Sequence, residues 1–458
     1  MDATGKPHPY REVLRLVWPL ALGMANNALM QFADRAFLAR DSMLALEAVL
    51  PATTLAWIFM SFFQSLVGYS GVFVAQYHGA GDAASCARSF RAGMVLAAVS
   101  GLFTLPLLPL GNWIFACTAS SPELLALERS YYDIILLSGF LVFGQMAATS
   151  YFTGRGRPRV VFWVNVLGNL LNVSLDPLLI FGLCGFPHLG IAGAAYATVL
   201  ALALQFAVLV FLVCRDMRRE RADAPVKAKK PLAPLMWRIL RYGIPAGGYE
   251  VLNMASFTIF VFVTGQVGDV AFAASNACFS VNYLLFAPMA GFGIGAQTLV
   301  GQALGRRDEE EARLALRRTL ILGVGFVTVL SAAAVVFHGP ILAMFAPDAG
   351  AGGQALAARR EFLSTGSVLM ALMATWQVFD ATDVIISGAL KGAGDTHFVM
   401  GWMLVCAFAF WLPLVFLVFR FHPTMPALWA TMIAFVVVIC AGTWIRWRRG
   451  PWRTIKLV

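Results

Sequence analysis

Long apolar segments alternate with short polar ones along almost the whole of this 458-residue chain. A transmembrane helix needs about 20 mostly apolar residues, and twelve segments satisfy that requirement. They lie at 13–38, 46–77, 92–115, 131–152, 160–181, 190–213, 239–267, 271–304, 315–337, 362–390, 397–419 and 427–447. Three prolines inside these segments are expected points of bending: Pro19, Pro245 and Pro288. The pattern therefore predicts an all-α polytopic membrane protein with twelve transmembrane helices.

A long polar stretch interrupts the apolar pattern close to the middle of the chain, at residues 215–236. Its three prolines are expected to prevent one continuous helix. The stretch divides the chain into an N-lobe, residues 1–214, and a C-lobe, residues 237–458, with six helices each. Because Lys and Arg outnumber Asp and Glu within it, we expect a basic cytoplasmic linker.

The composition supports a membrane protein and excludes other classes. Hydrophobic residues make up 59% of the chain and charged residues 13%, about half the charged share of a soluble domain, so many apolar side chains must face lipid. The net charge of +10 does not indicate a nucleic-acid partner, because the cations lie in short loops rather than on one solvated surface. The seven cysteines are scattered and include no CxxC pair, so we expect neither a metal centre nor a disulfide.

The positions of Lys and Arg predict the orientation of the helices, since cytoplasmic loops of membrane proteins are rich in these residues. With both termini in the cytoplasm, nearly all of the 34 Lys and Arg residues fall on the cytoplasmic side. The exceptions are Arg35, Arg40, Arg129, Arg359, Arg360 and Arg420. The first apolar segment has no small-residue cleavage site, so we expect it to remain as a helix. Abundant Ala, Arg and Gly favour a GC-rich bacterial genome, and we expect a monomer in the bacterial inner membrane.

The two halves of the chain repeat one another at an offset of 226 residues. The most informative match is Gln-x-x-Gly-x-x-Asp, which begins at Gln76 and again at Gln302. Other paired positions are Pro19 with Pro245, Asn27 with Asn253 and, after a small gap, Gly154 with Gly392 and Ala197–Thr198 with Ala430–Thr431. Since each copy has an even number of helices, we expect two pseudo-twofold-related six-helix bundles around a central cleft.

Acidic residues inside the apolar segments are the main candidates for function. A charged side chain at the centre of a bilayer costs about 2.5–3.5 kcal/mol even on the lenient scale, so it needs a cavity, a partner or a bound cation. These residues are Asp34, Asp176, Glu250, Asp380 and Asp383. Polar pairs one helical turn apart share a helix face, as in Asn172 with Asp176, Glu250 with Asn253, and Asp380 with Asp383. Amides alone more often hold membrane helices together, whereas the carboxylates favour a functional site.

The sequence contains no P-loop, no GxSxG, no HExxH and no EF-hand loop. We therefore expect that the protein is not an enzyme and that any transport is driven by an ion gradient or runs downhill. We expect no cofactor, with H⁺ or Na⁺ as the coupling ion, and no metal beyond Na⁺ at the carboxylates.

Several motifs together resemble the multidrug and toxic compound extrusion (MATE) family over nearly the whole chain. In the first half they are Gln31-Phe-Ala-Asp34-Arg-Ala-Phe-Leu and Asn172-Val-Ser-Leu-Asp176-Pro-Leu-Leu-Ile-Phe-Gly182. In the second half they are Gly243-Ile-Pro245, Gln302-Ala-Leu-Gly305, Gln377-Val-Phe-Asp380 and Ser387-Gly-Ala-Leu-Lys-Gly392-Ala-Gly-Asp-Thr396. The resemblance implies a secondary active antiporter that exports organic cations and drugs by alternating access, in exchange for H⁺ or Na⁺.

In the N-lobe, Asp34, Asn172 and Asp176 match the cation and proton site of the family branch near DNA-damage-inducible protein F. Arg35 stands where the family often has Thr, and we expect its side chain to point away from that site. Our hypothesis is that binding of H⁺ or Na⁺ at Asp34 and Asp176 neutralises an expensive charge. That change alters which packing of the two lobes is favoured.

In the C-lobe, the resemblance implies an ion or substrate site with Asp380, the carboxylate of the tenth helix, and we include Asp383 in it. The Glu that the Na⁺-coupled branch carries on the seventh helix falls on Asn253 here. Glu250 lies one turn earlier and is expected to reach the same cavity. This departure favours the N-lobe acids as the coupling site.

Two other functions stay open. A flippase of lipid-linked sugars or peptidoglycan precursors, from the same superfamily, usually has two extra helices or a cationic cavity, whereas the intramembrane charges here are mainly acidic. A membrane-embedded enzyme should carry acidic metal-binding motifs in its cytoplasmic loops, and a sensor should carry a soluble domain. Neither feature is found in the sequence. The expected partners are therefore organic cations or drugs, and the lipid bilayer.

Overall fold

A computed structural model describes residues 9–119, 121–222, 231–347 and 353–458. These residues form helices joined by short turns, and no strand occurs among them. Within the described ranges, eleven helices are long and apolar enough to cross a membrane. A further pair, bent by 43° at Ser138, makes a twelfth span if it is taken as one. The predicted all-α membrane fold is thereby confirmed for the described part of the chain.

The first half of the chain contains α1 to α9. The bounds are α1 Pro9–Asp41, α2 Met43–Gly68, α3 Ser70–Gly79, α4 Ala83–Phe103, α5 Leu107–Thr118, α6 Pro122–Leu137, α7 Gly139–Gly154, α8 Pro158–Ile180 and α9 Ile191–Ala222, with the short η1 at Leu183–Gly185. Side chains define several helix starts, since an oxygen just before a helix can accept from a free backbone N–H group. Ser42 caps α2, Asp82 caps α4 and Ser121 caps α6 in this way.

The second half contains α10 to α17. The bounds are α10 Ala233–Thr264, α11 Asp269–Gly305, α12 Glu309–Val336, α13 His338–Ala343, α14 Gly353–Ala393, α15 Thr396–Leu404, η2 Val405–Trp411, α16 Leu412–Phe421 and α17 Met425–Arg449, followed by η3 at Pro451–Thr454. The segment η2 is a π-helical stretch, and it continues from α15 into α16 so that Thr396–Phe421 forms one span.

One predicted span boundary is wrong. The segment 92–115 was predicted to be one span, but α4 ends at Phe103 and the remainder lies in the separate helix α5. Pro106 lies between the two helices, where its missing N–H group cannot continue the hydrogen-bond ladder of α4. At the linker, α9 extends to Ala222 and α10 begins at Ala233. Both helices thus enter the stretch 215–236, and its residues 223–230, with Pro225, Lys227, Lys229 and Lys230, lie outside the described residues.

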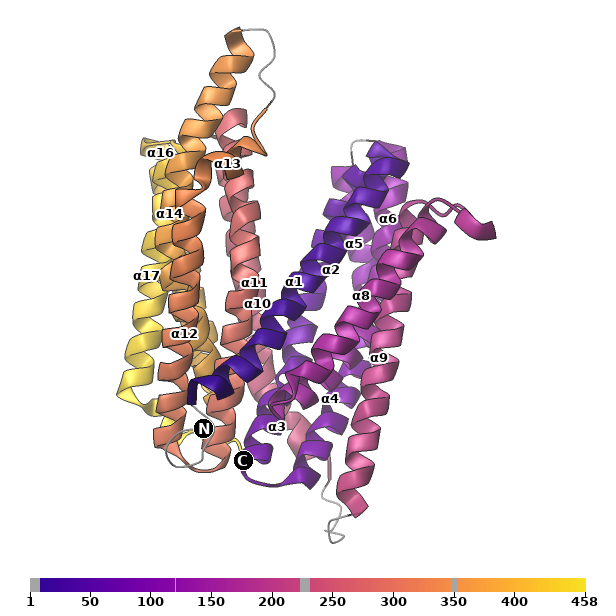
Figure 1. Cartoon of the computed structure of the whole chain (residues 1–458), viewed down its shortest axis with the longest axis vertical. Coiled ribbons are helices and arrows are strands. Elements are labelled where there is room, and N and C mark those ends of the chain that lie inside the picture. Colours follow the sequence, from indigo (N-terminus) through magenta and orange to yellow (C-terminus); the bar gives the residue numbers. More distant parts are fainter. Residues whose placement is uncertain (1–8, 120, 223–230, 348–352) are drawn as a thin grey trace. The chain divides into compact units, whose positions relative to one another are not determined.

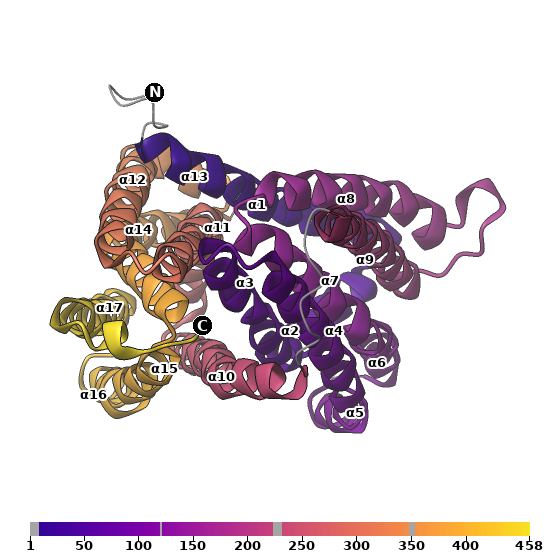
Figure 2. The same cartoon turned by 90° about the horizontal axis from the view of Figure 1, so that it is seen from below.

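The chain packs into two compact units. One contains Leu22–Glu250, Gly301–Asp308 and the last two residues; the other contains the chain up to Ala21, Val251–Val300 and Glu309–Lys456. In the first unit α8 and α9 lie side by side, as do α4 and α7 (Figures 1 and 2). In the second unit α14 packs against both α12 and α17. The unit borders fall inside α1, α10 and α11, so these helices contribute to both units, and the borders differ from the linker-based division into lobes.

The internal repeat is visible in the packing of each unit. A Cβ atom on Gly154 of α7 would lie 2.6 Å from the carbonyl oxygen of Gly71 in α3. A Cβ atom on Gly392 of α14 would lie 2.4 Å from the carbonyl oxygen of Gln297 in α11. Gly71 and Gln297 are separated by the same 226-residue offset, and Gly154 and Gly392 are repeat partners. In both copies, a glycine therefore allows two equivalent helices to contact each other backbone to backbone.

Candidate functional site

Three predicted N-lobe residues come together in the unit that contains Leu22–Glu250. Asp34 of α1 is 8% exposed, and Asn172 and Asp176 of α8 are fully buried. The Asn172 amide lies between α1 and α9. In the orientation that satisfies both of its polar atoms, its nitrogen donates to Asp34 Oδ1 over 2.9 Å and its oxygen accepts from the backbone N–H of Thr198 over 3.2 Å. Asn172 therefore fixes the position of the Asp34 carboxyl group.

The carboxyl group of Asp176 has an unusual environment. Neither of its oxygens accepts a hydrogen bond from any described residue. The Asp176 carboxyl group interacts electrostatically with the carboxyl group of Asp34. An ionised carboxylate can only accept a hydrogen bond, so the two groups can be hydrogen-bonded to each other only when one of them carries a proton. The pair is thus arranged to hold a proton or a small cation rather than two free charges.

A proline leaves one backbone acceptor of α8 without its helical donor. Pro177 follows Asp176 directly and lies inside α8. Proline has no N–H group, so the carbonyl oxygen of Val173, one turn earlier, lacks its usual helical donor. The sequence Asp-Pro therefore places carboxylate oxygens and a carbonyl oxygen without a helical partner on the same stretch of helix, which suits cation binding.

Tyr131 of α6 is a site residue that the sequence analysis missed. Its side chain is 7% exposed and lies within electrostatic range of both Asp34 and Asp176. It gave no signal in the sequence, because a tyrosine in an apolar helix usually packs in the core or at the lipid interface. Arg35, in contrast, is exposed.

Amide side chains extend the polar region along α1, α7, α8 and α9, with Asn169 and Gln205 buried, Gln145 half-buried and Asn27 exposed. Asn169 Nδ2 donates to Asn27 Oδ1 over 2.9 Å, and Gln205 Nε2 donates to Asn169 Oδ1 over 3.2 Å. Gln145 Nε2 donates to Gln205 Oε1 over 2.5 Å. These neutral groups satisfy one another, which is the helix-joining role expected for amides in a membrane protein.

In the other unit, Asp380 and Asp383 lie one turn apart on α14. Asp383 is 3% exposed and Asp380 is half-buried. Thr443 of α17 donates its hydroxyl to Asp383 Oδ1 over 2.7 Å, and Ser387 Oγ lies 3.4 Å from the same oxygen. Gln377, one turn before Asp380, is fully buried and neither of its amide atoms has a partner among the described residues.

The structure does not join Asn253 to that acidic pair. Glu250 and Asn253 are both half-buried on α10, but Glu250 is the last residue of one unit and Asn253 belongs to the other. The backbone carbonyl of Asn253 accepts from Ser256 over 3.0 Å. Within the described contacts, the Asn253 amide forms no hydrogen bond with Asp380 or Asp383. A C-lobe site built from these residues stays a prediction.

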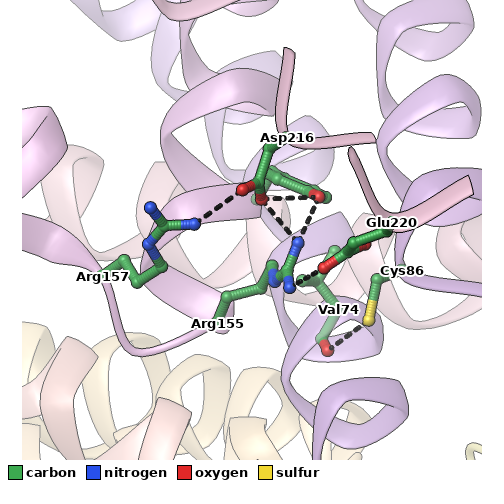
Figure 3. A network of polar contacts seen from close by, with 7 residues as sticks. Val74, Cys86, Arg155, Arg157, Asp216 and Glu220 are labelled. Atoms are coloured by element: carbon green, nitrogen blue, oxygen red, sulfur yellow. Dashed lines mark hydrogen bonds and ion pairs between the residues drawn. The ribbon is translucent and has the colours of Figure 1, made fainter. Parts of the chain in front are cut away.

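A second charged cluster lies at the end of α7 (Figure 3). Arg155 binds Asp216 over 2.6 Å and also binds Glu220, while Arg157 binds the other oxygen of Asp216 over 2.8 Å. Burial opposes the charge of Arg155, but its hydrogen bond to Glu220 and the nearby Asp216 raise its pKa above the ordinary value. Arg155 is therefore permanently charged and fastens the end of α9 to α7. The sequence analysis missed this cluster because both acids fall in the stretch assigned to the linker.

No group of three or more His, Cys, Asp or Glu side chains in the described part of the chain could hold a metal ion. The seven cysteines are all free.

Comparisons with known proteins agree with this architecture. The profile of the MatE family matches residues 19–178 and again residues 245–417. The two matches begin 226 residues apart, which confirms the offset of the internal repeat.

Among curated proteins, the chain is 29% identical over 405 residues to the probable multidrug resistance protein NorM of Bradyrhizobium diazoefficiens, covering 86% of this chain and 83% of that protein. It is 25% identical over 455 residues to the probable multidrug resistance protein NorM of Thermotoga maritima, covering 97% and 94%.

Solved structures share the fold. The outward-facing conformation of a multidrug resistance MATE family transporter of the MOP superfamily superposes with a TM-score of 0.84 at 18% identity, covering 98% of both chains. The eukaryotic MATE transporter AtDTX14 superposes with a TM-score of 0.82 at 17% identity, covering 97% and 96%.

Proposed function

The chain belongs to the MatE family, and from this premise we propose that it exports lipophilic organic cations in exchange for protons, with Asp34 and Asp176 as the coupling site. A membrane transporter for small molecules follows from the family, its multidrug resistance relatives and the membrane-spanning helices. The nature of the cargo and of the coupling ion is our proposal. We place the protein in the bacterial inner membrane with both termini in the cytoplasm.

One observation supports a proton rather than Na⁺ as the coupling ion. Asp176 is fully buried and its carboxyl oxygens receive no hydrogen bond from any described residue. Two negative charges in this position would repel each other without any neighbouring donor to stabilise Asp176. One proton shared between Asp34 and Asp176 removes a charge and supplies the missing hydrogen bond at the same time. Na⁺ would need several further oxygen ligands, and one carbonyl oxygen beside Pro177 does not complete such a set.

The same acids favour a cationic cargo. A transporter exchanges two species only if binding of one weakens binding of the other. Proton uptake reduces the negative charge of the pair, which attracts an organic cation, so proton entry promotes cation release. Deprotonation restores that charge, and the next cation is bound.

The direct test uses purified protein in liposomes that contain a fluorescent lipophilic cation. We expect efflux under a pH gradient alone and none under a Na⁺ gradient alone. Efflux driven only by Na⁺ would contradict proton coupling but leave the antiporter in place. If neither gradient drives efflux while the protein scrambles a fluorescent polyprenyl-linked sugar, the lipid-linked flippase is correct instead.

A further inference from the structure

Two helix ends, one from each half of the chain, cross at very short range. They are the last turns of α3, at Gly79, and of α11, at Gly305, and both belong to the unit that contains Leu22–Glu250. A Cβ atom on Gly79 would lie 2.0 Å from the carbonyl oxygen of Gln302. A Cβ atom on Gly305 would lie 2.0 Å from the carbonyl oxygen of Gln76. No side chain fits at these distances, so each helix approaches the other only because its partner has glycine.

The two helix ends contact each other in the same way, and both contacts are made by the Gln-x-x-Gly part of the repeat motif. Gln76-x-x-Gly79 and Gln302-x-x-Gly305 are repeat partners, and the glycine of each motif receives the glutamine carbonyl of the other. Small residues allow membrane helices to pack backbone to backbone. Contacts of this kind are made by van der Waals forces and weak Cα–H···O interactions. They can separate without leaving a buried charge behind.

A side-chain hydrogen bond ties the crossing to α7. Gln302 is 8% exposed, and its Nε2 atom donates to the carbonyl oxygen of Gly154 over 2.8 Å. The next residue, Arg155, is bound to Asp216 and Glu220 of α9 (Figure 3). The end of α11 is therefore attached to α7, and through Arg155 to α9, within this unit.

The crossing constrains movement of the two units because α11 belongs to both of them. The helix is continuous from Asp269 to Gly305, but its residues up to Val300 pack in one unit and Gly301–Asp308 pack in the other. Any movement of one unit against the other must therefore bend α11 near Val300 or release the Gly79–Gly305 crossing. We propose that this crossing is a latch that is closed in one access state of the transporter and released in the other. The proposal rests on the proposed function, because it assumes two access states.

The latch can be tested by adding one methyl group on either side. Gly79→Ala and Gly305→Ala are made in a background whose seven native cysteines are replaced by serine, with Ala303→Cys as a reporter. Ala303 is fully buried and lies in the same turn of α11. If the latch opens, the reporter becomes accessible to a membrane-impermeant maleimide in inside-out vesicles. We expect each glycine variant to raise the labelling rate about tenfold, since overpacking destabilises the closed crossing.

A matched control separates this effect from a general effect of added methyl groups. Gly325 of α12 is exposed, and a Cβ atom there meets nothing within 4 Å. Gly325→Ala should leave the labelling rate unchanged. If it rises as much as in the other two variants, the crossing has no special role and the proposal is overturned.

Gln302→Ala tests the latch without adding atoms, and it decides the question if the glycine variants fail to fold. Loss of the hydrogen bond to Gly154 should raise labelling about fivefold, with an unchanged gel-filtration profile. Unchanged labelling in a folded Gln302→Ala variant and in any glycine variant that folds would overturn the latch. The assay needs no cargo, so a labelling increase without cation efflux would support the latch and contradict only the proposed cargo.

Discussion

The two copies of the repeat carry opposite chemistry at matching positions. At the offset of 226 residues, Asp34 of α1 corresponds to Phe260 of α10, and Thr198 of α9 is the repeat partner of Thr431 of α17. In the first copy, Asp34 and Thr198 are joined by a buried asparagine. In the second, the Phe260 ring lies 5.3 Å from the Trp411 ring, whose indole N–H donates to Thr431 over 3.1 Å.

In the second copy, the aromatic side chains form a closed core. Phe260 is fully buried, Trp411 is 1% exposed, and the Trp411 ring also stacks on Phe435 with centroids 4.5 Å apart. Such a cluster gains stability from apolar burial and from aromatic contacts. One scaffold thus supports a titratable site in the first copy and plain packing in the second. At this position the first copy offers a titratable pair for the proposed coupling, and the second offers only apolar packing.

The largest expected effect follows from removing the carboxyl groups of the first copy. Asp34→Asn and Asp176→Asn keep the shape of each side chain but cannot exchange a proton. We expect each to reduce pH-driven efflux to the level of empty liposomes, with an unchanged gel-filtration profile. Glu123→Gln, at an exposed acid in the first turn of α6, is the matched control and should transport normally. Full efflux in both aspartate variants would move coupling to another site.

The converse change in the second copy should affect stability and leave coupling intact. Phe260→Ala removes a fully buried ring, and such changes cost about 3–5 kcal/mol in protein cores. Thermal unfolding in detergent can be followed with a thiol-reactive dye, since Cys278 and Cys406 are buried in the native state. We expect a clearly lower unfolding temperature, with pH-driven efflux retained at low temperature. Loss of pH dependence in the folded variant would show that the second copy also takes part in coupling.

The fold was largely predictable from the sequence, because hydropathy is a local property. Ten of the predicted spans coincide with continuous helical spans, of which 46–77 comprises α2 and α3 and 397–419 comprises α15, η2 and α16. The span 131–152 matches the broken pair α6 and α7. The division between α4 and α5 was missed, since the apolar run continues across Pro106 without a charged residue. A sequence window that averages hydrophobicity does not register one missing hydrogen bond.

The candidate site was predictable in part. Resemblance and the cost of a buried charge both indicated Asp34 and Asp176, although residues in α1 and α8 are far apart in sequence. Tyr131 was missed because its role depends on which helices α6 packs against. The partners of Arg155 were missed for a different reason: Asp216 and Glu220 look like solvated linker residues until α9 is seen to extend to Ala222. Long-range packing supplies this information, and local composition does not.

A smaller effect is expected from the threonine of the second copy. Thr431→Val keeps the shape of the side chain but removes the acceptor of the Trp411 indole N–H group, which then stays buried without a partner. An unsatisfied buried donor costs about 1–3 kcal/mol. We expect a moderate fall in the unfolding temperature, smaller than that of Phe260→Ala. An unchanged temperature would show that this hydrogen bond contributes little to the aromatic core.

The smallest effect is expected from the matched threonine of the first copy. The backbone N–H of Thr198 donates to the Asn172 amide, and the Thr198 hydroxyl donates to the carbonyl oxygen of Ala194 within its own helix. Valine keeps the backbone group, so Thr198→Val should change the free energy of unfolding by less than about 0.5 kcal/mol and leave efflux close to normal. A large loss of efflux in a stable Thr198→Val protein would mean that the hydroxyl itself contacts the proton or the cargo. The polar site would then extend onto α9. The two copies would then differ in function at the threonine as well as at the carboxyl pair.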